Sequence, residues 1–389
     1  MEKATRQFTK VHNIRLVLKT VYDKSPISRA DLARATGLTR ATISEIVGGL
    51  IERGFLEEVG VGSSAGGKPP ILVSLRANAR QVICADLKPD EFEVALVDLR
   101  GSIRYRRRWP TAGMRGEALV GLLVEAIDQM VSEAEAPLIG IGVIVPGLTD
   151  PLNGIVRRSV QLDWSDLALK QPLEARFELP IYLVNDSHAA ALAEYTFGEH
   201  SQNPNLIVVR AGDGISCGII LSGRLHHGDG FGAGEIGHLT VVEDGRLCSC
   251  GKTGCLETVA TSRAVLRAVR EVAAAPASQG RPGMPRWGDV LRRYASGEET
   301  ATAAVNQAGR YLGFSIASLV SILNVDHIVF TGSFTAFGEP FLNAVREEVR
   351  RRSLAKLAGD TRISNTVLGP ENLILGASAV VLSTELGLP

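Results

Sequence analysis

Residues 248–257 read CSCGKTGCLE and place three of the five cysteines of this 389-residue chain within eight positions. The other two, Cys84 and Cys217, stand alone in the apolar runs ICADL and ISCGII, where a buried thiol packs as a small hydrophobic side chain. The first ten residues, MEKATRQFTK, are charged and polar, unlike a secretion signal, and no apolar run reaches the roughly 20 residues that span a bilayer. We therefore expect a cytoplasmic protein in which the clustered cysteines bind a metal or act in redox chemistry.

A histidine upstream completes a candidate ligand set. Nine residues separate His238 from Cys248, one separates Cys248 from Cys250, and four separate Cys250 from Cys255. Three thiolates and one imidazole are the ligands of a closed structural zinc site, although this spacing departs from the usual paired CxxC pattern. The alternative is a loop of reduced thiols without metal. The nearby histidine favours one structural Zn²⁺ per chain, bound by these four residues.

The first 76 residues carry twelve Lys and Arg against seven Asp and Glu, although the whole chain has no net charge. Apolar residues recur at helical spacing over residues 11–24, and SPIS then breaks the pattern. Ser28 with Asp31 predicts a capping box for a helix over SRADLARAT, and Thr39 predicts the cap of a further helix over RATISEIVGGLIERG. Two short helices joined by a tight turn at Gly37 form a helix-turn-helix.

The second of these helices has small polar and basic residues near its N-terminus, where a recognition helix contacts the major groove. Two apolar strands follow and flank a glycine-rich basic loop, which predicts a wing able to reach phosphates or a minor groove. The alternative is a three-helix module that contacts only protein. Charge, helix pattern and loop together favour double-stranded DNA as the partner, with candidate contacts at Thr39, Arg40, Thr42, Ser44 and Lys68.

Beyond about residue 77 apolar strands alternate with helical patterns. QVICADL, FEVALVDL and SIRYRRRW read as consecutive strands joined by short turns, and IGIGVIV, IYLVN, NLIVVRA and DHIVFTG read as further strands among helices. This alternation predicts an α/β protein with helix-covered sheets of mixed strand direction. No internal repeat is visible in the sequence.

The segment 216–238, SCGIILSGRLHHGDGFGAGEIGH, followed by CSCGKTGCLE resembles the signature of the ROK family, which contains transcriptional repressors and sugar kinases. VIVPGLTDPLNGIV, LVNDSHAAALAE and the terminal LGASAVVL add matches, so the resemblance covers residues 80–385. The N-terminal winged module followed by GGKPP resembles the transcriptional regulators of the family, including those of the xylose-operon type. Kinases of the family normally lack this module.

The resemblance implies a winged helix-turn-helix over residues 1–76, followed by a two-lobed, actin-like (ribonuclease-H-like) sugar-kinase-type domain. We expect a first lobe over 77–195, completed by a C-terminal helix over 371–389, and a second lobe with the zinc site over 196–370. The resemblance also implies a sugar cleft between the lobes.

A sugar site needs carboxylates, amides and imidazoles that converge on several hydroxyl groups. Taken alone, Asp186 could cap a helix, His238 could serve only the metal, and Glu235 could be a surface carboxylate. The family match instead implies that the sugar-binding residues are Asn185, Asp186, Glu235, His238 and Glu257.

A sugar kinase also needs a backbone cradle for the nucleotide phosphates. The family's DxGGT-like loop corresponds here to residues 86–90, DLKPD, in which Lys88 and Pro89 replace the glycines. The second phosphate loop, GTGIG in kinases, reads GDGIS and brings in Asp213, and the late FTGSF lacks a glycine-rich run. We therefore expect no enzymatic activity, although Asp186 stands at the base position of the family's kinases.

These patterns lead to the hypothesis of a repressor, acting as a homodimer or homotetramer, whose operator affinity is controlled by a sugar or sugar derivative. One alternative is a bifunctional ATP-dependent sugar kinase. A second is a zinc-stabilised DNA-binding regulator without a small-molecule effector.

Overall fold

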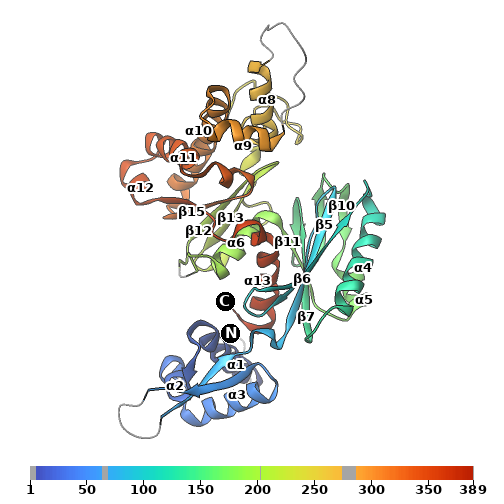
Figure 1. Ribbon diagram of the computed structural model, residues 1–389, viewed down its shortest axis with the longest axis vertical. Helices are drawn as coiled ribbons and strands as arrows, with labels where there is room; N and C mark the ends of the chain where they lie inside the picture. The colour runs from blue at the N-terminus through green and yellow to red at the C-terminus, as the bar shows by residue number, and fades with distance from the viewer. Residues whose placement is uncertain (1–5, 64–68, 202, 274–285, 389) are drawn as a thin grey trace. The chain divides into compact units, whose positions relative to one another are not determined.

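The computed structural model describes residues 6–63, 69–201, 203–273 and 286–388 (Figure 1). Contacts divide the chain into two compact units, Met1–Asp186 with Ala377–Pro389 and Ser187–Gly376. Within the described ranges, no helix is both long enough and apolar enough to cross a membrane. The domain boundaries expected after residues 76 and 195 stay predictions.

The first unit begins with a winged helix-turn-helix module, and capping residues set its helix boundaries. Ser28 Oγ accepts a hydrogen bond from the Asp31 N–H at 3.1 Å, and Thr39 Oγ1 accepts one from the Thr42 N–H at 3.2 Å. Both helix starts predicted from the sequence are therefore confirmed. The short sheet has the order β1-β3-β2, and residues 64–68 of the wing lie outside the described residues. The elements are α1 (Arg6–Lys24), β1 (Ile27–Ser28), α2 (Arg29–Thr36), α3 (Arg40–Glu52), β2 (Leu56–Val61) and β3 (Ile71–Leu75).

The rest of the first unit is a five-stranded mixed sheet with the order β11-β7-β4-β5-β6. In Figure 1, α4 and α5 lie on one face of this sheet and α13 on the other. The approach of α13 requires a glycine, because a Cβ at Gly142 would lie 2.7 Å from the Ala377 carbonyl oxygen. The elements are β4 (Gln81–Asp86), β5 (Glu91–Asp98), β6 (Ile103–Pro110), α4 (Gly116–Ser132), β7 (Leu138–Val145), α5 (Lys170–Phe177), β11 (Ile181–Asn185) and α13 (Asn372–Leu386), with a small sheet of β8 (Leu148–Asp150), β9 (Ile155–Ser159) and β10 (Trp164–Ala168).

The second unit holds another five-stranded sheet, with the order β14-β13-β12-β15-β16. Alternate residues of β12 face opposite sides: Ile207 packs with the helices on one face, and Val208 packs with α6 on the other. Its elements are α6 (Asp186–Phe197), β12 (Leu206–Ala211), β13 (Ile215–Leu221), β14 (Arg224–Leu225), α7 (Glu257–Ala260), α8 (Ser262–Ala273), α9 (Trp287–Ala295), α10 (Glu299–Leu323), β15 (His327–Thr331), α11 (Gly338–Arg352), α12 (Ala355–Asp360) and β16 (Arg362–Asn365).

The two large sheets share one topology. In each, three consecutive strands pair antiparallel, and two later strands add in parallel beside the first of them. The duplication was invisible in the sequence, because strand order depends on pairing and not on residue identity. The predicted two-lobed sugar-kinase-type fold is confirmed, and Cys84 and Cys217 are buried in it, as expected.

Candidate metal and ligand-binding site

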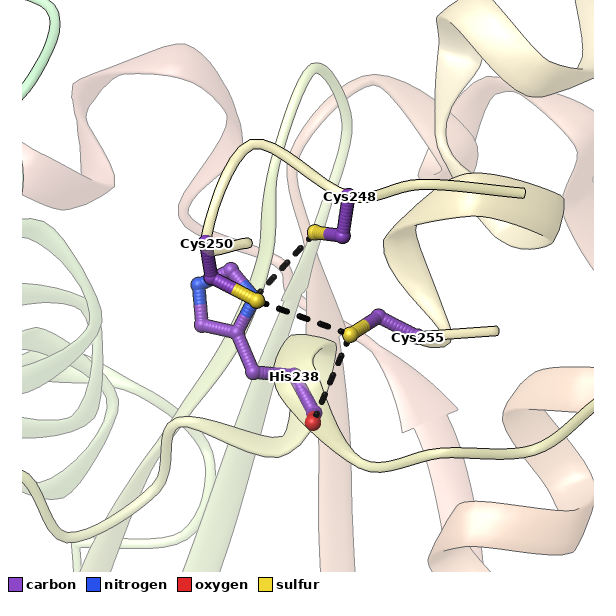
Figure 2. Close-up of side chains that lie close together, drawn as sticks. All are labelled: His238, Cys248, Cys250 and Cys255. Carbon is purple, nitrogen blue, oxygen red and sulfur yellow. Dashed lines mark hydrogen bonds between the residues drawn. The ribbon is translucent and has the colours of Figure 1, made fainter. Parts of the chain in front are cut away.

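The candidate metal ligands come from one short helix and the loop that follows it in the second unit. His238 ends the 3-10 helix η2 (Ile236–His238), and Cys248, Cys250 and Cys255 precede α7. Figure 2 shows the four side chains gathered together, and their ligand atoms all lie within 4.8 Å of one another. The structure thus brings together all four residues that the sequence singled out.

The spacing of these atoms suits a tetrahedral metal ion. Cys248 Sγ lies 3.6 Å from His238 Nδ1, and Cys250 Sγ lies 3.7 Å from Cys255 Sγ. Zinc with bonds of about 2.3 Å to sulfur and about 2.0 Å to nitrogen places neighbouring ligand atoms about 3.5–3.8 Å apart. The donor set therefore fits a divalent metal ion.

The thiols of the cluster differ in their electrostatic surroundings. The backbone N–H of Lys252 lowers the pKa of the exposed Cys250 thiol, whereas burial raises the pKa of the Cys255 thiol to about 12. A neutral thiol is thus the stable form of Cys255 without a cation, and a bound metal ion would convert it to the thiolate.

Glu257 connects the metal loop to the first residue of β13. Its Oε1 accepts a hydrogen bond from the Ile215 N–H at 2.9 Å. Gly237 makes room for this contact, because a Cβ there would lie 2.2 Å from the Ile215 oxygen and 2.8 Å from Glu257 Cγ. The glycine of the GEIGH segment is therefore needed for close packing.

Three of the predicted sugar-binding residues converge in the second unit. His238 Nε2 lies 4.0 Å from Glu235 Oε2, and His238 Nδ1 lies 4.0 Å from Glu257 Oε2. In the first unit, Asn185 is the buried last residue of β11, and Asp186 is the half-buried residue that begins α6. Each unit thus presents its own set of polar groups, and whether these groups bind a sugar stays a prediction.

The two loops that correspond to the phosphate-binding loops of the family's kinases form ion pairs and hydrogen bonds within the protein. Lys88 Nζ forms an ion pair with Asp86 Oδ2 at 2.6 Å, and the Pro89 oxygen accepts hydrogen bonds from Thr111 Oγ1 and an Arg115 guanidinium N–H. In the second loop, Asp213 accepts a hydrogen bond from the hydroxyl of the first residue of α8.

The predicted DNA-contacting residues share the N-terminal end of α3. Thr39, Arg40 and Ser44 are exposed, and Thr42 is half-buried and hydrogen-bonded to the Thr39 cap. Lys68 lies outside the described residues. Thr39, Arg40 and Ser44 are thus accessible at the N-terminal end of the helix, where a recognition helix contacts DNA, and their contact with DNA stays a prediction.

Three arginines that sequence reasoning missed join the winged module to the rest of the first unit. Each donates to carbonyl oxygens at the C-terminal end of a helix: Arg100 to Tyr22 in α1 at 2.7 Å, Arg80 to Arg53 at the end of α3 at 3.1 Å, and Arg15 to α13 at 2.9 Å. A positively charged side chain is stabilised at the C-terminal end of a helix, because the last carbonyl groups have no partner within the helix and carry partial negative charge. Their partners lie 78, 27 and 369 positions away, so no local pattern could have revealed them.

A helix-turn-helix module joined to a two-lobed, sugar-kinase-like domain with a His/Cys₃ cluster defines a DNA-binding regulator built on a sugar-kinase scaffold. The chain belongs to the ROK family, whose model matches residues 82–384, and the IclR helix-turn-helix domain matches residues 23–60.

The relatives that match nearly the whole chain include transcriptional regulators. The xylose repressor of Caldicellulosiruptor bescii is 31% identical over 96% of both chains. The crystal structure of a ROK family transcriptional regulator, a homolog of the E. coli MLC protein, is 27% identical, with a TM-score of 0.86 over 98% of both chains. A ROK family glucokinase from Streptomyces griseus, solved with glucose and AMPPNP, is 26% identical, with a TM-score of 0.68, and covers 77% of this chain and 98% of its own.

Proposed function

We propose that this protein represses transcription by binding operator DNA and that a sugar or sugar derivative controls its operator affinity. One observation carries the proposal: a helix-turn-helix and a sugar-kinase-like domain occur in one chain, and a repressor matches that chain over 96% of its length. Operator binding would place its action in the cytoplasm. The xylose named for that relative is the first effector to test.

In this proposal α3 enters the major groove, with Thr39, Arg40, Thr42 and Ser44 at the DNA and Lys68 on the wing. A homodimer or homotetramer presents two such modules to a two-fold symmetric operator. The effector changes operator affinity only if it binds two conformations of the protein with different affinities.

The proposed sugar contacts are Asn185, Asp186, Glu235, His238 and Glu257. Carboxylates and amides can accept and donate hydrogen bonds to the hydroxyl groups of a sugar, and charged acceptors strengthen these bonds. A structural Zn²⁺ on His238 and the three cysteines supports them indirectly, because the metal would fix the loop that leads into Glu257.

We infer that the protein does not transfer a phosphoryl group. Lys88 already pairs with Asp86 in the first phosphate loop, and its side chain and Pro89 stand where kinases of the family have glycines. Asp213 adds negative charge to the second loop, where it would repel the phosphates of ATP. Asp186 would then bind the effector without acting as a base.

The experiment is a sugar panel on the full-length protein, with thermal shift as the measure of binding and fluorescence anisotropy of a labelled operator as the measure of function. A ligand that binds only the folded state raises the melting temperature. We expect at least one sugar to raise it and to change operator affinity. Asp186→Asn should lower the affinity of the protein for that sugar by roughly tenfold or more, because a charge-assisted hydrogen bond is lost.

Asp166→Asn, at an exposed carboxylate of the same unit, is the matched control and should respond like the wild type. No shift with any sugar would favour a regulator without effector. Sugar-dependent ADP formation that disappears in Asp186→Asn would show instead that the protein is a kinase.

A further inference from the structure

A basic pocket of about 260 Å³ lies in the second unit, between the C-terminal half of α11, the end of α12 and the start of β16. Three arginines line it: Arg346 and Arg350 from α11, and Arg362 from β16. The other described residues of its lining carry no charge, and they are Val349, Ala358, Thr361 and Ile363. The proposed function assigns no role to this pocket.

The pocket lies away from the loops that correspond to the phosphate-binding loops of kinases. Strands β12, β15 and β16 run parallel, and the second of those loops follows the C-terminal end of β12. Arg362 is the first residue of β16, so the pocket adjoins the N-terminal ends of these strands. The six residues of β12 separate the two ends by roughly 16 Å, at about 3.3 Å per residue. Glu257, a proposed sugar contact, bonds to Ile215 at the far end.

The three guanidinium groups differ in their partners. That of Arg346 donates to the Ile363 carbonyl oxygen at 2.5 Å and pairs with Glu339 at 2.6 Å, which holds it in place and compensates its charge. Arg350 and Arg362 are exposed, and neither forms an ion pair or a side-chain hydrogen bond with a residue that the structure describes. The pocket therefore has two guanidinium groups without a counter-charge.

Helix geometry explains only one of these two positions. Arg350 lies in the last turn of α11, where the helix dipole favours a cation. Arg362 begins a strand, so this reason does not apply to it. Arg350 also follows Arg346 by four positions, which places both on one face of the helix, where like charges repel. A bound anion would remove this repulsion.

The lining indicates which class of anion fits. A guanidinium group can bind a carboxylate or a phosphate through two parallel hydrogen bonds. Two guanidinium groups without a counter-charge therefore suit a ligand with two negative charges. Val349 and Ile363 are buried and add a short apolar surface. The volume lies below the range of about 300–1,000 Å³ typical of ligand pockets, which restricts the ligand to a small molecule.

We infer that this pocket is a second ligand site, which binds a small dianion through Arg350 and Arg362. A dicarboxylate and a phosphate share this chemistry, and the experiment below separates them. The site goes beyond the proposed function, because it requires neither the proposed sugar contacts nor the metal cluster.

Isothermal titration of the full-length protein with succinate, inorganic phosphate and acetate, at pH 8 and constant ionic strength, tests the inference. We expect one of the two dianions to bind, and acetate, with its single charge, to bind more weakly. Arg350→Gln and Arg362→Gln should each lower the affinity for that dianion by about tenfold or more, the usual effect of losing a hydrogen bond to a charged group. Arg362→Lys should retain part of the affinity because it keeps the charge. Tighter binding of succinate would identify a dicarboxylate, and tighter binding of phosphate would identify a phosphate.

Arg351→Gln is the matched control, because Arg351 is an exposed arginine of the same helix that does not line the pocket. Its partner Glu348 keeps an ion pair with Arg352 in this variant. Four results would each overturn the inference: equal affinity of the wild type and both pocket variants, an equal loss in Arg351→Gln, acetate binding as tight as that of the dianions, or no binding of either dianion at millimolar concentration. The titrations contain no sugar, so a failure of sugars to alter operator binding would count against the proposed function alone.

Discussion

His238 lies between the candidate metal ligands and the proposed sugar contacts. Its Nδ1 lies 3.6 Å from Cys248 Sγ, within the cluster, and its Nε2 lies 4.0 Å from Glu235 Oε2. If His238 held a metal ion through Nδ1, the proton of the neutral imidazole would lie on Nε2, which could then donate a hydrogen bond away from the metal. A bound metal would thus determine both the orientation of the His238 ring and whether its Nε2 can donate a hydrogen bond to a ligand.

Replacing Cys250 by Ser tests this connection. Three ligands hold zinc less well than four, so we expect Cys250→Ser to lose most of the single zinc ion per chain, to melt at lower temperature and to respond less to effector. Metal analysis of the purified protein and thermal melts measure these effects. Ser249→Ala, between two candidate ligands, should keep its metal. Wild-type protein without zinc and with three freely titratable thiols would contradict the site.

At the scale of elements, α3 combines a local start signal with an exposed polar surface. Thr39 satisfies the N–H of Thr42, while Ile43, Val47 and Leu50 are buried in the module. The same short segment therefore fixes where the helix begins and which residues face away from the core. Arg40, the first residue of α3, is exposed.

Arg40→Ala should reduce operator affinity by about tenfold, a value typical of one lost arginine contact with DNA. If the contact is to phosphate, the salt dependence of binding should also become shallower by about one unit of slope. Anisotropy titrations at several salt concentrations measure both quantities. Lys19→Ala removes one positive charge from α1 and serves as the control. Equal losses in both variants would indicate a general charge effect in place of a recognition contact.

Helix α6 contains a buried carboxyl that links it to α13. Glu194 Oε1 accepts hydrogen bonds from Thr366 Oγ1 and, at 3.2 Å, from Asn372 Nδ2. Burial raises the pKa of Glu194 above its ordinary value of 4.5. The folded protein therefore holds this proton more tightly than the unfolded chain, so stability falls as pH rises from about 4.5 through the raised pKa.

Glu194→Gln removes this titration and keeps an oxygen that accepts both hydrogen bonds. We expect the variant to gain melting temperature relative to the wild type at pH 8 and to gain less, or nothing, at pH 5. Thermal melts of both proteins across this range give the comparison. Glu125→Gln, at an exposed carboxylate of α4, should show no such pH-dependent difference. A variant that is less stable than the wild type at pH 8 would show that the carboxylate charge itself stabilises the fold.

At the scale of the whole molecule, the chain passes between the two units only within α6 and α13. Gly376 of α13 packs directly on α6, where a Cβ would lie 1.8 Å from the Ala189 oxygen. The other end of α13 accepts hydrogen bonds from Arg15 of the winged module. One helix therefore runs from a connection between the units to the DNA-binding module, and we expect it to contribute to the coupling of effector binding to operator binding.

Arg100→Ala tests another contact between the winged module and the rest of the first unit. Arg100 donates to Tyr22 O at 2.7 Å and to Ser25 Oγ at 2.8 Å, and its guanidinium lies 4.4 Å from the centre of the Tyr22 ring. Without these contacts we expect operator binding to persist while its response to effector shrinks. Arg107→Ala, on the same hairpin, loses a bond to Gln129 and a contact with the Trp109 ring within the first unit and is the control. An undiminished effector response in Arg100→Ala would show that this contact is not needed for the response.

Much of the local structure could be predicted because its causes are local. Caps at Ser28 and Thr39, the period of apolar residues and the close spacing of the cysteines all act within a few residues. The residue types of the metal cluster also restrict its chemistry to a few ions, whatever the fold. The resemblance to a family added the two-lobed architecture, which no local pattern predicts.

The sequence by itself determined the helix-turn-helix, the strand-rich domain and the His/Cys₃ ligand set, because short-range spacing decides each of them. Only the tertiary structure decided that two sheets share one strand order, that Arg15, Arg80 and Arg100 bind helix ends, and that Arg346, Arg350 and Arg362 line one pocket. These features depend on contacts between segments far apart in the chain. The partner of such a side chain depends on how the chain packs in space. Sequence periodicity therefore does not predict it.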